Sequence, residues 1–185
     1  MSAVQAVFMT AWAGFLAYWV ISARHLKKTV RRKGSWTSGF VIALVGVGIG
    51  VLARIPGLAP LVHSRWFPGS VALDAIAIAL CVGGIALAIV ARAYLGTNWS
   101  AQPSVKEGHE LVTSGPYHYV RHPIYTGVLL AMLGSVLVVS TIFAVVWITA
   151  LVIFLVRIRI EEALMTQQFP DQYPRYKKQT KRLIP

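Results

Sequence analysis

The sequence predicts an all-α, polytopic membrane protein of about five transmembrane helices, of which the last two form a helical hairpin. Three observations support this fold class. Hydrophobic residues make up 56% of the chain and charged residues only 13%, unlike a soluble domain. Apolar stretches cover residues 3–22, 40–53, 71–91 and 124–156, and Asp74 is the one charged residue within them. A spanning helix needs about 20 apolar residues. The basic residues cluster between these stretches, as in the loops of membrane proteins.

The first three apolar stretches predict three separate spans. Residues 3–22 and 71–91 are long enough alone, and the second stretch becomes long enough when it is taken from 36 to 53, where no charge falls. No basic residue precedes the first stretch, so it lacks the positive start of a cleaved signal peptide. We therefore expect it to remain in the mature protein as a helix.

The last apolar stretch, residues 124–156, is too long for one span at 33 residues. It forms either one long tilted helix or two short helices folded back on each other. A weak break, from Gly134 through Ser140 and Thr141, lies near its middle. A hairpin returns the basic C-terminal tail to the side of the other basic segments. We therefore predict two helices, which bring residues 121–125 back beside residues 157–162.

The distribution of basic residues predicts the orientation in the membrane. Of the 18 lysines and arginines, 16 share one side if the N-terminus is outside, and positive loops face the cytoplasm. We expect a cytoplasmic cofactor site and C-terminus, with the net charge of +12 facing anionic membrane lipid. A nucleic-acid partner is not expected, because no aromatic and basic binding module is present.

The histidines and the cysteine argue against a metal or redox site. Cys81 is the only cysteine, so neither a disulfide nor a Cys-rich zinc site can form within the chain. His118 and His122 are four residues apart, but the residue after the first is not the Glu that a zincin needs. Pro116 and Pro123 bracket the pair and disfavour a continuous helix. We predict no bound metal.

Three polar clusters are expected to share the cytoplasmic side, at residues 95–112, 115–127 and 157–176. They divide the chain into transmembrane helices at 1–91 and a C-terminal catalytic half at 92–185. Their cations, acids and aromatic rings suit a small zwitterion together with a lipid-like anion. No phosphate-binding glycine loop and no hydrolase triad is present.

Arg157 and Glu161 are four residues apart and therefore share one helix face. One interpretation is an ion pair within the helix, worth a few tenths of a kcal/mol. The other is a division of labour, in which the guanidinium holds an anion and the carboxylate holds a ligand ammonium. The residue types alone leave both open.

The C-terminal half resembles the isoprenylcysteine carboxyl methyltransferases, integral membrane enzymes that use S-adenosyl-L-methionine. The resemblance rests on NWS at 98–100, HELVTSGPYHYVRHPIYTG at 109–127, RIRIEE at 157–162 and F-x-x-x-Y-x-x-Y from 169. The RHPxYxG element with a downstream double glutamate is fairly specific for this group and its phospholipid methyltransferase relatives. The first two spans carry no motif.

The resemblance implies the roles of particular residues. The cofactor-binding positions are Gln102, His109, Glu110, Leu111, Val112, Tyr117, His122, Pro123, Ile124, Tyr125 and Glu161. The substrate-binding positions are Asn98, Trp99 and Arg157, and Arg157 is also the one implied catalytic residue. Two departures from the family pattern are Pro170, where a Gly is common, and a short N-terminal region.

The implied function is methyl transfer from S-adenosyl-L-methionine to the carboxylate of an isoprenylcysteine or a similar lipid-like thioether, with S-adenosyl-L-homocysteine as product. A carboxylate is already ionised at pH 7 and needs no base. An amine acceptor, as in phospholipid N-methylation, needs one, for which His118, Glu107 and Glu162 are the candidates. A membrane reductase is a third candidate activity, and a non-catalytic lipid-binding membrane protein is the non-enzymatic candidate. The sequence does not set the oligomeric state.

Overall fold

Long apolar helices dominate the computed structural model, which describes residues 3–24, 29–32, 44–45, 47–48, 51, 54–55, 57, 68–100, 102–138 and 143–185. Helices α1 (Ala3–Ser22), α4 (Val71–Leu95) and α7 (Phe143–Gln168) are long and apolar enough to cross a membrane, and α6 (Pro123–Val138) is a shorter apolar helix. The chain is therefore a mostly helical integral membrane protein. The predicted second span lies largely outside the described residues.

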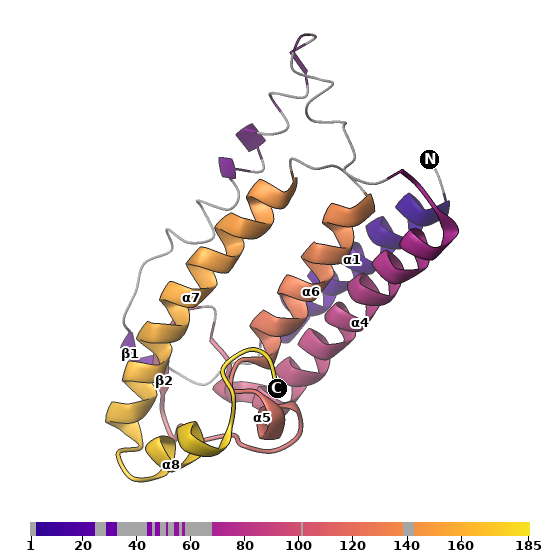
Figure 1. Ribbon diagram of the computed structural model, residues 1–185. Helices are drawn as coiled ribbons and strands as arrows, with labels where there is room; N and C mark the ends of the chain where they lie inside the picture. Colours follow the sequence, from indigo (N-terminus) through magenta and orange to yellow (C-terminus); the bar gives the residue numbers. More distant parts are fainter. Residues whose placement is uncertain are drawn as a thin grey trace.

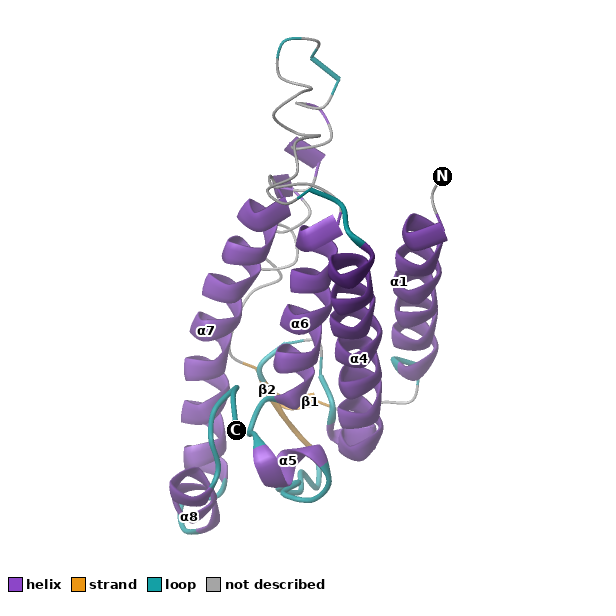
Figure 2. Cartoon of the chain, turned by 45° about the vertical axis from the view of Figure 1, so that its right-hand side comes forward, coloured by secondary structure: helices purple, strands orange, loops and turns teal. Residues whose placement is uncertain are grey.

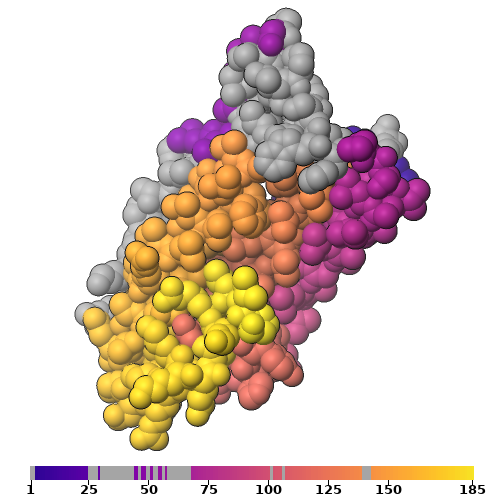
Figure 3. Space-filling view, in the orientation of Figure 1, coloured from indigo at the N-terminus to yellow at the C-terminus, as the bar shows by residue number. Residues whose placement is uncertain are grey.

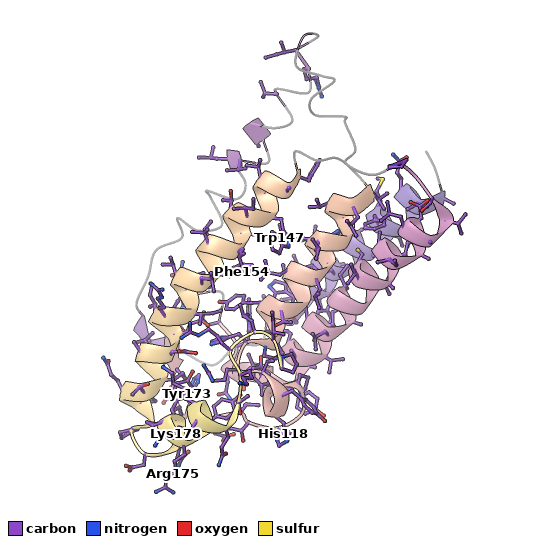
Figure 4. All side chains as sticks on the ribbon, viewed as in Figure 1. His118, Trp147, Phe154, Tyr173, Arg175 and Lys178 are labelled. Atoms are coloured by element: carbon purple, nitrogen blue, oxygen red, sulfur yellow. The ribbon has the colours of Figure 1, made fainter. Side chains whose placement is uncertain are left out.

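The four helices pack in the order α1, α4, α6 and α7, as Figures 1 and 2 show. Helices α6 and α7 run in opposite directions side by side, and the indole N–H of Trp147 donates to the carbonyl of Leu129 across their contact at 2.8 Å (Figure 4). The predicted hairpin is thus confirmed. Its break lies at the late end of the predicted stretch, because α6 continues to Val138 and Gly134 lies inside it.

Glycines allow α4 and α6 to approach closely. A Cβ built on Gly84 would lie 2.6 Å from the main-chain nitrogen of Ala131, whereas one on Gly83 would meet nothing within 4 Å. The backbones therefore touch at Gly84, with Gly127 facing it from α6. Of the two neighbouring glycines, only Gly84 lies at this close contact, where a small residue lets two membrane helices approach.

Two prolines shape the turn that leads into α6. Helix α5 (Pro116–Tyr119) is a single turn that follows Gly115, whose φ of 60° suits a residue without a side chain. The chain is extended at Val120, and α6 begins at Pro123. As predicted, no continuous helix displays both His118 and His122, and His122 takes the position before the first residue of α6.

A small sheet and a short amphipathic helix complete the described fold. Strands β1 (Thr29–Arg32) and β2 (Ser104–Lys106) pair antiparallel, so the prediction of an all-α chain is wrong in this detail. The pairing joins segments far apart in sequence, so no local sequence pattern indicates it. After η1 (Gly96–Asn98), the remaining element is α8 (Gln172–Gln179), which lies at the end of the bundle. Figure 3 shows the C-terminal residues covering the surface beside the end of α7.

Candidate functional site

A cavity opens at the end of the bundle where α4 ends, α6 begins and α8 follows α7. Its empty volume, which includes the open mouth, is about 860 Å³. Residues 98–100, 102–104 and 109–112, together with Tyr117 of helix α5, complete its wall. The three polar clusters recognised in the sequence therefore meet at one place.

Most of the predicted site residues line this cavity. They are Gln102, His109, Glu110, Leu111, Val112, Tyr117, His122, Ile124, Tyr125 and Glu161, with Asn98 and Trp99 among the predicted substrate positions. Two predicted residues do not line it. Pro123 is fully buried at the start of α6, and Arg157 lies one helical turn before Glu161.

Glu161 lines the cavity together with a second acid, Glu110. The hydroxyl of Tyr125 donates to Oε1 of Glu161 at 2.6 Å, and Nδ1 of His122 lies 3.6 Å from Oε2 of Glu161. The Tyr125 ring stacks on Phe154 at a centroid distance of 4.6 Å and on His122 at 5.8 Å. The hairpin therefore brings residues 121–125 against residues 157–162, as predicted.

Arg157 stands beside this carboxylate. Its Nη2 lies 3.9 Å from Oε1 of Glu161, and its guanidinium lies 6.0 Å from the centre of the Tyr125 ring. The ion pair within the helix, one of the two interpretations of the sequence, is therefore present. It is long and 19–24% exposed, so both groups keep the capacity to bind a ligand.

Several buried polar atoms on the cavity wall have no hydrogen-bond partner among the described residues. They are both side-chain polar atoms of Gln102, Oγ of Ser104, the hydroxyl of Tyr117 and Nε2 of His122. An unpaired buried polar group costs about 1–3 kcal/mol, so such groups mark places where a ligand would compensate the loss. Burial raises the pKa of Tyr117 well above its ordinary value. Its hydroxyl therefore remains a donor at neutral pH.

Sequence reasoning gave no role to several further wall residues, including Met165, Tyr173 and Tyr176. The two tyrosines belong to the F-x-x-x-Y-x-x-Y motif, which was the available signal, while Met165 follows Glu161 by one helical turn. The Tyr176 hydroxyl donates to the carbonyl of Tyr117 at 2.6 Å. Burial raises the pKa of Tyr173, and raises that of Tyr176 to about 12. All three tyrosines are therefore neutral in the cavity wall.

Arg92 supports the part of the wall that contains Trp99. Its guanidinium donates to the carbonyls of Ser22 and Gly96, both at 2.7 Å, and lies 4.4 Å from the Trp99 ring centre. Trp99 in turn meets the Trp19 ring edge to face at 5.4 Å. One buried arginine thus joins the ends of α1 and α4 to the cavity. A lone arginine at the end of a span gave no such signal in the sequence.

The three candidate general bases do not line the cavity. His118 and Glu107 are exposed, and Figure 4 places His118 at the outer end of the molecule. Glu162 is 4% exposed and lies within 3.0–3.1 Å of nitrogen atoms of Arg121, Lys177 and Arg182. A carboxylate held by three cations is a poor proton acceptor, so its candidacy as a base is wrong.

No group of three or more His, Cys, Asp or Glu side chains in the described ranges is arranged to hold a metal ion. Ring nitrogens of His122 lie 3.6 Å from carboxylate oxygens of both Glu161 and Glu162. These contacts are ion-pair distances between protein groups. The donor set of the cavity therefore suits an organic ligand.

Comparison with known proteins shows which family and which structure the chain is similar to. The family model described as "Isoprenylcysteine carboxyl methyltransferase (ICMT) family" matches residues 77–167. The structure of the eukaryotic intramembrane Ras methyltransferase ICMT superposes with a TM-score of 0.58 at 25% identity, over 83% of this chain and 54% of that one. The resemblance predicted from the sequence motifs is therefore confirmed.

Two curated relatives each match part of this chain and part of their own length. The protein-S-isoprenylcysteine O-methyltransferase of Schizosaccharomyces pombe is 39% identical over 80 residues, which are 42% of this chain and 34% of that protein. The cobalt-zinc-cadmium resistance protein CzcN of Cupriavidus metallidurans is 31% identical over 126 residues, 66% of this chain and 55% of that protein. The chain thus spans between about a third and somewhat more than half of these relatives' lengths.

Proposed function

We propose that this chain, whose residues 77–167 belong to the isoprenylcysteine carboxyl methyltransferase family, methylates the carboxylate of an isoprenylcysteine or a similar lipid-like thioether. The methyl donor would be S-adenosyl-L-methionine. The observation that carries the proposal is the cavity in which Glu161, His122 and Tyr125 meet buried, unpaired polar groups. The likeness to a methyltransferase structure supports it independently.

The residues present fit this cofactor. Its ammonium suits Glu161, whose carboxylate is held in place by Tyr125 at 2.6 Å. The unpaired amide of Gln102 and the hydroxyl of Tyr117 would supply donors and acceptors for the remaining polar groups. When bound, the cofactor supplies a methyl group on an electrophilic sulfonium.

The chain itself would orient the reactants and exclude water. A carboxylate acceptor is ionised at neutral pH, which agrees with three candidate bases that lie away from the cavity. Arg157 would hold this carboxylate, since its guanidinium lies beside the wall residue Glu161. Attack by an oxygen anion needs no covalent intermediate, so positioning is the main contribution. Phospholipid N-methylation would require a base and is the less favoured alternative.

The proposed orientation has the N-terminus outside and the site and C-terminus in the cytoplasm. Of the 18 lysines and arginines, 16 then lie on the cytoplasmic side. The acceptor's hydrocarbon tail would enter sideways from the bilayer. A reporter fused to the C-terminus should be accessible from the cytoplasm, and an external reporter would refute this arrangement.

The decisive assay separates the acceptor classes by the chemistry of the product. Protein in vesicles receives methyl-labelled S-adenosyl-L-methionine with either a farnesylcysteine analogue or phosphatidylethanolamine. A carboxyl methyl ester releases volatile labelled methanol in alkali, whereas an N-methyl group does not. We expect alkali-labile label with the farnesylcysteine analogue. Stable label in the phospholipid would favour the alternative, and absence of cofactor binding would indicate a non-catalytic protein. Oxidation of a nicotinamide cofactor without methyl transfer would indicate a reductase.

A further inference from the structure

The C-terminal segment, which comprises α8 and residues 180–185, pairs with the turn that carries His122. The main-chain N–H of Arg121 donates to the carbonyl of Lys181 at 2.8 Å, and the N–H of His122 donates to the carbonyl of Arg182 at 3.2 Å. Val120 and Lys181 form a parallel bridge. This pairing fixes the backbone from which the His122 ring reaches the cavity.

Glu162 holds the same segment through its side chain. Nζ of Lys177 and Nη2 of Arg182 each lie 3.1 Å from its Oε2, while Nε of Arg121 donates to its Oε1 at 3.0 Å. The guanidinium of Arg121 also donates to the carbonyls of Lys177 and Thr180. A buried carboxylate is tolerated only when its partners compensate for lost hydration. Two of its three cations come from the C-terminal segment.

The same segment supplies part of the cavity wall. Tyr173 and Tyr176 of α8 line the cavity, and the Tyr176 hydroxyl donates to the carbonyl of Tyr117. Movement of the segment away from Arg121 would therefore remove one wall and release the N–H of His122. A ligand that contacts this wall must bind the paired form better than the open form.

We infer that Lys177 and Arg182 are positioning residues, which act through Glu162 to hold the C-terminal segment closed over the cavity. Closure and cofactor binding are therefore coupled. The inference rests on the proposed function for the identity of the ligand. By thermodynamic reciprocity, a ligand that favours closure lowers the population of the open form, and a change that favours opening weakens binding of the ligand.

Arg182 offers the cleanest perturbation. Its side chain is 41% exposed, so Arg182→Gln leaves no large cavity and the protein should fold. Lys178→Gln is the matched control, because this substitution also removes one positive charge. Lys178 lies exposed on α8, at the outer end of the molecule in Figure 4. Arg182→Lys keeps the positive charge, so it should hold the C-terminal segment nearly as well as the wild-type arginine.

The experiment measures hydrogen exchange at the main-chain amides of Arg121 and His122, which report the pairing directly. Without ligand, Arg182→Gln should exchange about tenfold faster there than wild type, the scale of one charge-assisted bond. Lys178→Gln should match wild type. S-adenosyl-L-homocysteine should slow exchange at both amides in wild type, and its Kd should rise in Arg182→Gln.

Two results would overturn the inference. Equal exchange in Arg182→Gln and wild type without ligand would show that the side chain does not hold the segment. Ligand binding that leaves exchange at both amides unchanged would show that closure and binding are not coupled. Wild-type protein that fails to bind S-adenosyl-L-homocysteine would instead refute the proposed function and the coupling to it. The exchange measurement without ligand tests separately whether Arg182 holds the C-terminal segment against the turn.

Discussion

Replacement of Tyr125 by Phe removes one hydroxyl from the centre of the candidate site and leaves the ring in place. The hydroxyl donates to Oε1 of Glu161 at 2.6 Å, while the ring stacks on Phe154 at 4.6 Å. A hydrogen bond to a charged group contributes about 1.5–3 kcal/mol. Glu161 is 24% exposed and keeps Arg157 at 3.9 Å, so water and the guanidinium compensate in part. We therefore use the lower limit, about 1.5 kcal/mol.

That free energy corresponds to about a tenfold loss of affinity. We expect Tyr125→Phe to raise the Kd of S-adenosyl-L-homocysteine about tenfold in titration calorimetry of detergent-solubilised protein. The melting temperature should fall by a few degrees, because the bond is also present without ligand. Tyr119→Phe is the control, because Tyr119 is 66% exposed and does not line the cavity. Unchanged affinity in Tyr125→Phe would refute the claim that the hydroxyl orients Glu161. Tighter binding would mean that it competes with the ligand.

Three further predictions concern the supports of the site. Gly84→Ala should lower the melting temperature by several degrees, because its Cβ would meet the backbone of α6, whereas Gly83→Ala should not; equal melting points would contradict the close contact. Arg92→Lys should raise the KM for the acceptor about fivefold through loss of the contact between the guanidinium and Trp99, while cofactor affinity stays unchanged. A lower affinity for the cofactor with an unchanged KM for the acceptor would refute this. The pKa of Tyr176 is about 12, against about 10 when unfolded, so wild-type stability should fall as pH rises from 10 to 12. Tyr176→Phe should lose about 1 kcal/mol at neutral pH and fall less above pH 10; an identical alkaline profile would contradict this role.

The helices and the centre of the site could be predicted because their causes are local. Apolar length gave α1 and α4, and the return of the basic tail gave the hairpin that brings Glu161 to Tyr125. Proline chemistry gave the separation of His118 from His122. The apolar stretches and the prolines lie within the features they predict, and the hairpin follows from the distribution of charge along the chain.

The remaining features depend on contacts between distant segments. The pairing of Val120 with Lys181 uses main-chain groups, which every sequence offers equally. Glu162 looked like a possible base because the sequence does not reveal which cations surround it after folding. Arg92 likewise gains its role only when α1 ends beside it. Sequence motifs thus indicated which residues meet at the site. They did not indicate which residues position the others through ion pairs and hydrogen bonds.

The central claim is that Glu161 binds the ammonium of S-adenosyl-L-methionine in this cavity. Equilibrium binding of the labelled cofactor to detergent-solubilised wild type, Glu161→Ala and Glu107→Ala tests it directly, because Glu107 is an exposed acid that does not line the cavity. We predict saturable binding by wild type and Glu107→Ala, and at least about tenfold weaker binding by Glu161→Ala. Full binding by Glu161→Ala would contradict the assignment.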